Sequence, residues 1–308
     1  MTGAGWLVLR LAVGVGLCPL LPGLTQTIKA RLQGRRGGSP LQPYRELRRL
    51  WGKSGVDPDG SGPVYRAAPA VTAAALVAAL AVVPLAGNRD SGSLLGHDAL
   101  VLVGLLALAR FVVTLAAWDT GSGFALMGAG RDLTFAVFVE PLLLLVLILA
   151  ALPSGSTDLS LLAARTAGSA RWTTPVAWCA AAGFLLVVLA ETGRQPIDNP
   201  DTHLELTMVH EGPLLEYAGR DLALLQWAAA ARHWVVLVLA VTVFLPHGGP
   251  TWSRALSLVV GLPLLCAALA LTETWQAKMR ILRVPHLLLT GSLLALAGFA
   301  SYFAIGAP

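Results

Sequence analysis

Seven carboxylates gather in one short stretch of a chain that has few charges elsewhere. The sequence of 308 residues holds 17 acidic residues, and seven of them lie between positions 191 and 221: Glu191, Asp198, Asp201, Glu205, Glu211, Glu216 and Asp221. Carboxylates held close together cannot all ionise cheaply, so their protonation is coupled. Such a group between apolar segments favours proton or ion transfer. The alternative is a solvated loop, where charged side chains are ordinary.

The same stretch has features of a buried segment. Hydrophobic residues such as Ile197 and Leu206 are interspersed with the acids, and three prolines exclude a single continuous helix. We therefore expect the segment to fold back on itself and to be partly buried. Arg194 and Arg220, in the stretch, and Arg131, at the start of an apolar run, are the basic residues expected to support the carboxylates.

Glu140 is the most deeply placed carboxylate that the sequence predicts. It follows Arg131 by nine residues, which places it about 13 Å further along a helix. An isolated ionised carboxylate there would be costly, so Glu140 must be protonated, paired or close to water. We favour proton transfer over the alternative, a protonated glutamate that only hydrogen-bonds a neighbouring helix. Arg110 and Arg232 could pair with Glu140 or with the acidic stretch, and the sequence does not match the partners.

These residues lie among long apolar runs. Hydrophobic residues make up 56% of the chain and charged residues 13%, against about a quarter charged in soluble domains. The pattern of residues 41–52 predicts a short amphipathic helix in the membrane interface. The composition of residues 191–218 predicts an acidic loop. About 20 apolar residues are enough to cross a bilayer. We therefore predict an all-α integral membrane protein that forms a single domain over 1–308. Its bundle would have eight transmembrane helices, near 5–24, 66–87, 97–118, 132–152, 173–190, 219–245, 252–272 and 285–305.

Basic residues are distributed unevenly between the two sides of this bundle. Loops on the side of the acidic stretch carry fifteen Lys or Arg residues, and the opposite loops carry four. The positive-inside rule then places both termini outside and the acidic loop in the cytoplasm. Because the basic loop after the first span lies directly against the membrane, lipid headgroups and a cytoplasmic partner suit it better than nucleic acid.

The sequence predicts no redox or catalytic centre in this chain. Cys18, Cys179 and Cys266 each fall inside an apolar span and form no CxxC pair, which argues against an iron–sulfur or zinc site. His203 and His210 lie among the acids and could bind a metal, but we favour histidines that hydrogen-bond within the loop. The sequence has no phosphate-binding glycine loop and no nucleophile elbow. We expect no catalytic residue, metal or cofactor in the chain itself.

The stretch ETGRQPIDNPDTHLELTMVHEGPLLEYAGRD, from 191 to 221, resembles the signature of respiratory complex I subunit 1. That family has an E-T-x-R-x-P-F-D segment, further acids and an E-Y motif between its fifth and sixth spans; Ile197 stands here for the Phe, and His203 for an acid. The DNPDTHLELTMVHE form resembles the membrane subunit of formate hydrogenlyase and hydrogenase-4, which are group 4 nickel–iron hydrogenases. TIKARLQGRRGGSPLQPYRELRRLWGK, WDTGSGFALMGAGRDLTFAVFVEP and KMRILRVP also resemble segments of the family, in the expected order.

The resemblance implies a bacterial plasma-membrane subunit of an oxidoreductase complex, which anchors a soluble redox arm and couples it to proton or sodium translocation through a chain of carboxylates. Its partners would be hydrogenase-like large and small subunits, an iron–sulfur subunit, antiporter-like membrane subunits and lipid. Those partners would carry the iron–sulfur clusters and any nickel–iron centre. Two alternatives stay open: a subunit that forms the quinone site of a complex I-like enzyme, and a stand-alone ion transporter. The family's acidic positions match Glu140, Glu191, Asp198, Glu205 and Glu216, and its basic position matches Arg194.

Overall fold

The computed structural model describes residues 3–85, 96–165, 173–198, 209–245 and 251–305. Within these ranges the chain is helical and has no strand, only one isolated bridge between Asp98 and Asp158. Its α-helices are α1 (Gly3–Leu17), α2 (Leu20–Leu32), α3 (Gln42–Trp51), α4 (Pro63–Val82), α5 (Ala99–Thr120), α6 (Gly123–Ala151), α7 (Leu159–Arg165), α8 (Pro175–Glu191), α10 (Gly219–Phe244), α11 (Thr251–Trp275) and α12 (Val284–Ile305). Short 3-10 turns are η1 (Leu152–Ser154), η3 (Gly212–Leu214) and η4 (Ile281–Arg283).

The described chain contains seven helical segments that are long and apolar enough to cross a membrane, which confirms an all-helical membrane protein. One further helix, α8, was expected as the fifth span, but its 17 residues measure only about 26 Å, against a hydrocarbon core of about 30 Å. The structure therefore gives seven candidate spans where eight were predicted: Leu7–Leu32, Pro63–Val82, Ala99–Thr120, Gly123–Ser154, Gly219–Phe244, Trp252–Trp275 and Ile281–Ala304.

Two predicted helix boundaries differ from the structure. The range 5–24 is divided between α1 and α2, with the break at Cys18 and Pro19. Proline lacks the N–H that would continue α1, and its fixed φ suits the start of α2. The range 132–152 begins too late, because α6 starts at Gly123. Small residues of this glycine-rich segment pack against α5, as Ala129 does against Ala117, and so allow two helices to approach closely.

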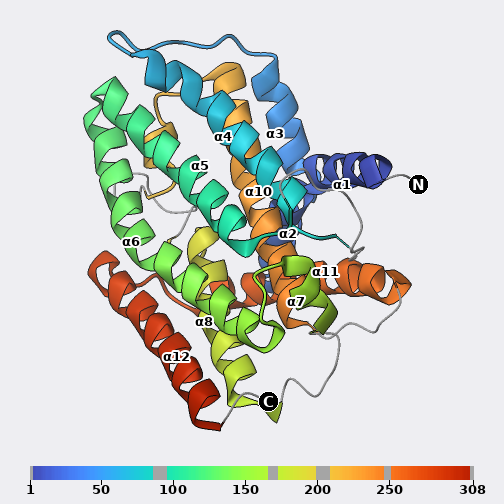
Figure 1. The fold of residues 1–308 in the computed structure, drawn as a ribbon. Helices are drawn as coiled ribbons and strands as arrows, with labels where there is room; N and C mark the ends of the chain where they lie inside the picture. Colours follow the sequence, from blue (N-terminus) through green and yellow to red (C-terminus); the bar gives the residue numbers. More distant parts are fainter. Residues whose placement is uncertain (1–2, 86–95, 166–172, 199–208, 246–250, 306–308) are drawn as a thin grey trace.

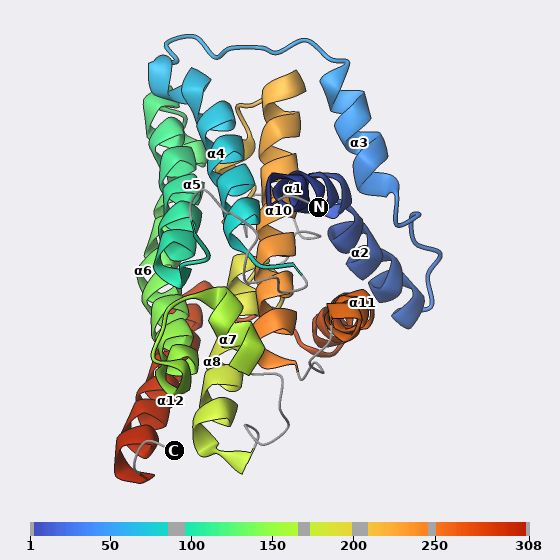
Figure 2. The same cartoon turned by 45° about the vertical axis from the view of Figure 1, so that its right-hand side comes forward.

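Helix α10 forms the centre of the bundle. It contacts α4, α3, α8 and α11, and 83% of its apolar window is buried. Figures 1 and 2 show α4, α5 and α6 side by side on one flank of α10, with α2, α3 and α11 on another. Helices α6, α8 and α12 pack against one another beside them. Side chains that point from α5, α6 and α8 toward α10 therefore meet in the interior.

The predicted amphipathic helix 41–52 is α3, and it packs against α2 and α10. Leu50 is buried, and the Tyr44 hydroxyl donates a hydrogen bond to the backbone oxygen of Gly16 at 2.6 Å. Leu41 and Trp51, which the sequence places on the same apolar face, are about half exposed. Helix α3 is thus held against the bundle by one part of its apolar face.

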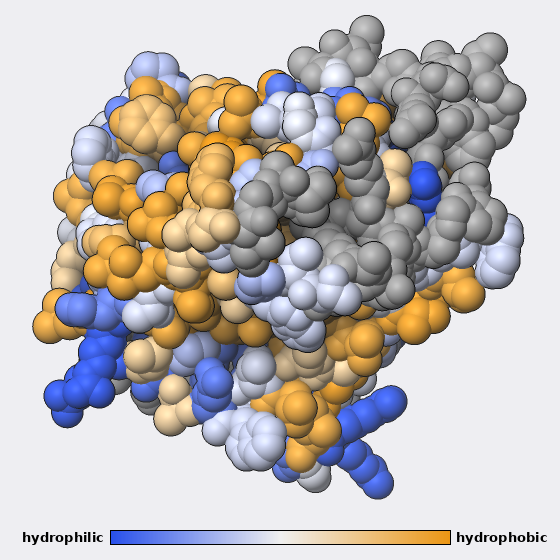
Figure 3. All heavy atoms as spheres, turned by 60° about the horizontal axis from the view of Figure 1, so that its bottom comes forward, coloured by the Kyte–Doolittle hydropathy of each residue, from blue (hydrophilic) through white to orange (hydrophobic). Residues whose placement is uncertain are grey.

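Apolar side chains also cover much of the outer surface. Figure 3 shows one face on which hydrophobic side chains predominate among the described residues, with hydrophilic side chains at its edges. Exposed large hydrophobic side chains occur on most of the long helices, for example Phe111, Val137, Trp178, Val259 and Phe303. Such a surface suits contact with lipid or with other membrane subunits.

Candidate functional site

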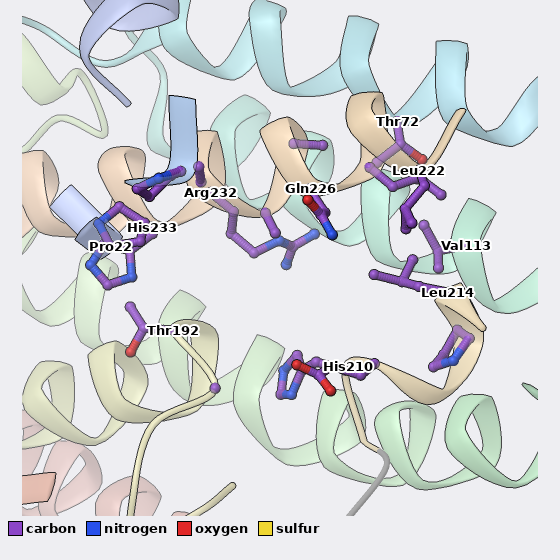
Figure 4. A pocket seen from close by; sticks show the side chains of 18 of the residues that line it. Pro22, Thr72, Val113, Thr192, His210, Leu214, Leu222, Gln226, Arg232 and His233 are labelled. Atoms are coloured by element: carbon purple, nitrogen blue, oxygen red, sulfur yellow. The ribbon is translucent and has the colours of Figure 1, made fainter. Parts of the chain in front are cut away.

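The predicted acidic loop, residues 191–218, is called the acidic segment below, and the structure describes its parts 191–198 and 209–218. A cavity of about 710 Å³ lies between α10 and this segment, with further walls from α2, α3, α4 and α5. Figure 4 shows Arg232 and Gln226 of α10 directed into this cavity, with His210 opposite them. Apolar side chains such as Leu214 and Leu222 form other parts of the wall. A few polar groups therefore converge in a largely apolar space, which is typical of a functional pocket.

Glu191 lies at the inner wall of the cavity, between two arginines. Its Oε1 is 2.9 Å from Nη2 of Arg110, its Oε2 is 2.7 Å from Nη1 of Arg232, and its side chain is 1% exposed. It is also the last residue of α8, where the helix dipole disfavours a negative charge. The carboxylate is therefore held in the protein interior by its two cationic partners. Arg232 is fixed further by a 2.8 Å hydrogen bond to the backbone oxygen of Leu106.

Arg110 connects Glu191 with two carboxylates of α6. Its Nη1 lies 3.5 Å from Oε1 of Glu140, and its Nε lies 3.7 Å from Oδ2 of Asp132. The Arg110 and Asp132 side chains are 6% and 13% exposed, whereas that of Glu140 is 33% exposed. One guanidinium thus contacts three carboxylates from two helices, and Glu140 is the most accessible of the three.

His210 joins the acidic segment to this group. Its Nδ1 is 3.1 Å from Oδ2 of Asp198, and its Nε2 is 3.9 Å from Oδ1 of Asp132. Burial lowers the pKa of His210, but the hydrogen bond to Asp198 and the charges of both aspartates outweigh burial and raise the pKa above its ordinary value. Lys278, which follows α11, lies 3.7 Å from the other Asp198 oxygen, and burial lowers its pKa despite that contact.

A second buried cluster holds the start of the acidic segment. Arg194 and Lys29 place cationic nitrogens 3.0 and 3.1 Å from the two oxygens of Glu273, and each of these side chains is less than a tenth exposed. The contacts join the segment to α2 and to the end of α11. Because each residue comes from a different element, the cluster fixes where the segment leaves α8.

The other end of the acidic segment is held against α4 by two tyrosines. The rings of Tyr65 and Tyr217 stack with centroids 4.2 Å apart. The Tyr217 hydroxyl donates to the backbone oxygen of Tyr65 at 2.9 Å, and the Tyr65 hydroxyl donates to the backbone oxygen of Glu216 at 2.7 Å. Glu216 itself is half-buried. These bonds fix the backbone through which the segment enters α10.

The first turn of α10 carries two of the predicted residues. Arg220 is exposed, and Asp221 is half-buried where the helix dipole favours a negative charge. Gly219 precedes them with φ of +56°, and a Cβ there would lie 2.7 to 2.8 Å from backbone oxygens of residues 53–54. Only glycine permits both the backbone angle and this contact. The loop after α3 therefore rests directly on the start of α10.

The family model described as NADH dehydrogenase matches residues 5–303, almost the whole chain. The chain belongs to this family, that of complex I subunit 1. Formate hydrogenlyase subunit 4 of Escherichia coli K12 is 34% identical over 300 residues, which cover 94% of this chain and 95% of the relative. Hydrogenase-4 component C of the same organism is 36% identical over 302 residues, covering 91% and 90%.

The fold of this complex I subunit 1 relative is also found in a solved structure. A chain in the structure of the membrane-bound sulfane sulfur reductase, an archaeal respiratory membrane complex, superposes with a TM-score of 0.80 at 21% identity, covering 95% of this chain and 96% of that one. At this identity the likeness shows the fold alone. Together with the two E. coli relatives, it makes the chain a multi-pass membrane subunit of the complex I-like type.

Within this family member, the structure brings three predicted carboxylates together. Glu140, Glu191 and Asp198 are joined through Arg110 and His210. The other predicted residues are dispersed: Glu211 is exposed at the cavity wall, Glu216 and Asp221 lie near the two tyrosines, Arg131 is half-buried beside Asp132, Arg220 is exposed, and Arg194 pairs with Glu273. Asp201, Glu205 and His203 lie outside the described residues.

Three charged residues of the site, Asp132, Lys278 and Lys29, were not singled out as site residues from the sequence. Asp132 and Lys278 lie close to predicted residues, and Lys29 belongs to the second cluster. Glu273, its partner there, was expected from the sequence to join the acidic residues. The common signal of the three is a charged residue near the polar end of an apolar run, which also describes many solvated residues. Among the described residues, no group of three or more His, Cys, Asp or Glu side chains is placed to hold a metal ion.

Proposed function

We propose that this chain is the membrane-anchoring and coupling subunit of a complex I-like hydrogenase or formate hydrogenlyase type complex. In this role it links redox chemistry in a docked soluble arm to translocation of protons or sodium ions through its carboxylates. The observation that carries the proposal is the continuous set of charged contacts from the acidic segment, through His210 and Arg110, to Glu140 within α6.

The charge balance of this interior group supports exchange of a proton. Arg110 and Arg232 contribute two positive charges, whereas Asp132, Glu140 and Glu191 contribute three negative charges when all are ionised. The five side chains then carry one negative charge in excess, and an excess charge is costly in a low-dielectric interior. One bound proton removes it. A group of this composition can therefore exist with or without that proton, as a coupling element requires.

The distances indicate which carboxylate takes the proton. At an effective dielectric constant of about 20, the ion pairs at 2.9 and 2.7 Å attract ionised Glu191 by about 12 kcal/mol together. The single pair at 3.5 Å attracts Glu140 by about 5 kcal/mol, and its 33% exposure reduces that value further. Asp132 is held about as strongly by Arg110 at 3.7 Å, but it is 13% exposed and also faces His210 at 3.9 Å. Glu191 is therefore the fixed anion of the group, and Glu140, with one ion pair and the greatest exposure, is the exchangeable one.

The family resemblance suggests the partners. The acidic segment, α3 and the basic loops would face the cytoplasm and would receive a hydrogenase-like large subunit, a small subunit and an iron–sulfur subunit. Seven crossings would place the termini on opposite sides, so both termini lie outside only if α8 crosses the membrane as well. The apolar outer helices suit antiporter-like membrane subunits and lipid (Figure 3). The chemistry of iron–sulfur or nickel–iron centres would belong to those partners, and the bacterial plasma membrane is the compartment that the E. coli relatives favour.

One observation favours a second candidate function, that of a quinone-site subunit. The cavity of about 710 Å³ lies within the range of small-molecule sites, and apolar residues from α2, α4 and α10 line much of it. A quinone headgroup would meet the polar residues near Arg232 and His210. The same charged contacts would then couple quinone reduction to Glu140.

The proposal is tested by purifying the tagged protein in mild detergent with its bound partners. Nickel, iron and hydrogen evolution or uptake in the purified complex would support the hydrogenase-type assignment. Iron without nickel, together with quinone reductase activity, would favour the quinone-site alternative. Recovery of a single chain that conducts ions in liposomes would overturn both assignments and support a stand-alone transporter.

A further inference from the structure

His210 occupies a position that neither the family membership nor the carboxylate chain explains. One residue separates His210 from η3 in the chain. Its two ring nitrogens face carboxylates from different elements, Asp198 at 3.1 Å and Asp132 at 3.9 Å. Figure 4 shows the imidazole at the cavity wall. It thus links the acidic segment to α6 at Asp132, separately from the contact that Arg110 makes between Glu191 and α6.

The surroundings hold the ring in this orientation. Gly193 packs against it: a Cβ at Gly193, where φ is +60°, would lie 3.1 Å from the Nδ1 atom of His210. The charged groups that face the imidazole are the two aspartates, Arg110 behind Asp132, and Lys278 behind Asp198. The aspartates favour the imidazolium and Arg110 opposes it, with a net rise in the pKa of His210. Imidazole is the side chain whose ordinary pKa lies nearest neutral pH, so it can both accept and release a proton.

We propose that His210 is a proton relay between Asp198 in the acidic segment and Asp132 in α6. This inference rests on the proposed coupling function and adds a specific carrier to it. Asp198 lies within hydrogen-bond distance of Nδ1, at 3.1 Å, and Asp132 faces Nε2 at 3.9 Å, a gap that one bridging water or a small approach closes. Carboxylates on opposite nitrogens of one ring let imidazole accept a proton on one side and release another on the other side.

The step balances without a further reactant. Neutral His210 carries its proton on Nε2 and accepts a proton on Nδ1 from the carboxyl of Asp198, which becomes a carboxylate. The imidazolium then releases the Nε2 proton to the carboxylate of Asp132, which becomes neutral. Neutral His210 now carries its proton on Nδ1, and exchange with water in the cavity, which removes that proton and returns one to Nε2, restores the starting tautomer. One proton has then moved from Asp198 to Asp132, with His210 and the water unchanged.

The result reaches Glu140 through charge. Neutral Asp132 no longer competes for Arg110, so the guanidinium holds the Glu140 carboxylate more strongly. Protonation of Asp132 therefore favours release of the proton that Glu140 carries. No proton has to pass through the guanidinium, which remains charged throughout.

The test uses the complete complex in proteoliposomes, with redox turnover and proton uptake measured together. His210→Gln and His210→Asn place a neutral amide near Nε2 and near Nδ1, respectively, and neither can relay a proton. Both should lower proton uptake per turnover at least tenfold, and added imidazole should restore part of it, since the cavity beside His210 admits the free base. The matched control is His286→Gln, an exposed histidine on α12 whose Nδ1 lies near a backbone oxygen at 3.1 Å. It should behave as the wild type.

Glu140→Gln in the same assay separates the two proposals. If it abolishes coupling while both His210 variants couple normally, the relay is wrong and the proposed function stands. If Glu140→Gln also couples normally, the proposed function itself is wrong. Loss of coupling in the His210 variants without imidazole rescue, or failure of both to assemble, would assign His210 a structural role and overturn the relay.

Discussion

Glu140 and Glu191 share one arginine, yet their replacement by glutamine should affect different properties: coupled translocation for Glu140 and stability for Glu191. Glu140→Gln removes the exchangeable carboxylate and leaves Arg110 paired with Glu191 and Asp132. It also brings the five-residue group from one excess negative charge to neutrality. We expect the free energy of unfolding to change by no more than about 1 kcal/mol, because partly exposed ion pairs contribute little to stability. Coupled translocation, in contrast, should fall at least tenfold.

Glu191→Gln removes the buried anion on which both arginines converge. Arg232 then keeps a hydrogen bond to the Leu106 backbone oxygen but loses its 2.7 Å ion pair. Breaking a buried pair by removing one partner destabilises by about 3–5 kcal/mol, because the remaining charge is left uncompensated. We therefore expect a lower thermal unfolding midpoint and reduced assembly of the complex.

The two variants are measured side by side, by thermal unfolding of the detergent-purified complex and by proton uptake per redox turnover in proteoliposomes. Glu140→Gln should unfold close to the wild type but fail in translocation; Glu191→Gln should unfold well below it. A Glu140→Gln complex that still translocates fully, or a Glu191→Gln complex as stable as the wild type, would refute the division into an exchangeable and a fixed carboxylate.

Three further predictions concern the acidic segment. Glu273→Gln leaves Lys29 and Arg194 with no carboxylate between them and should destabilise the subunit by about 3–5 kcal/mol, seen as a lower unfolding midpoint. The pKa of His210 is raised in the fold, so its imidazolium stabilises the segment fully below about pH 6.5 and progressively less as pH rises through the higher folded pKa. Protection of the 209–215 amides, measured as the exchange rate relative to the intrinsic rate at each pH, should therefore fall over that window in the wild type but not in His210→Gln. Gly219→Ala places a Cβ 2.7 to 2.8 Å from backbone oxygens and should increase proteolysis of the loop after α3. Gly155→Ala, at an open position with φ of +63°, tests the effect of φ alone.

Composition and periodicity predict the membrane class, because every long helix of this chain is apolar over its length. The same signals misplace helix ends. Pro19 was visible in the sequence, but an apolar run continues across it, and only the three-dimensional path shows a break there. Gly123 reads as a turn residue and is the first residue of α6, since packing of small residues against α5 outweighs the low helix propensity of glycine.

The site was predictable as a set of candidates and not as a set of pairs. Arg110, Arg232 and Glu140 stand out because a charge within an apolar run requires a partner or water. Their partners are distant in sequence: Arg110 and Glu191 are 81 positions apart, and Arg194 and Glu273 are 79 apart. Asp132 was read as the start of a span, although it contacts both Arg110 and His210. Periodicity along one element carries no information on such contacts.

The pairing itself explains how an event in the acidic segment can act on Glu140. The segment is fixed at its start by the Arg194–Glu273 contact and at its end by the stacked Tyr65 and Tyr217, while His210 lies between these two anchors. A partner that displaces the segment between its anchors must change the distance from His210 to the carboxylates of α6. Arg110 interacts with three carboxylates at once. A gain or loss of charge at Asp132 or Glu191 therefore changes the strength of the ion pair between Arg110 and Glu140. In the proposed function, movement of the segment would thereby change the charge near Glu140.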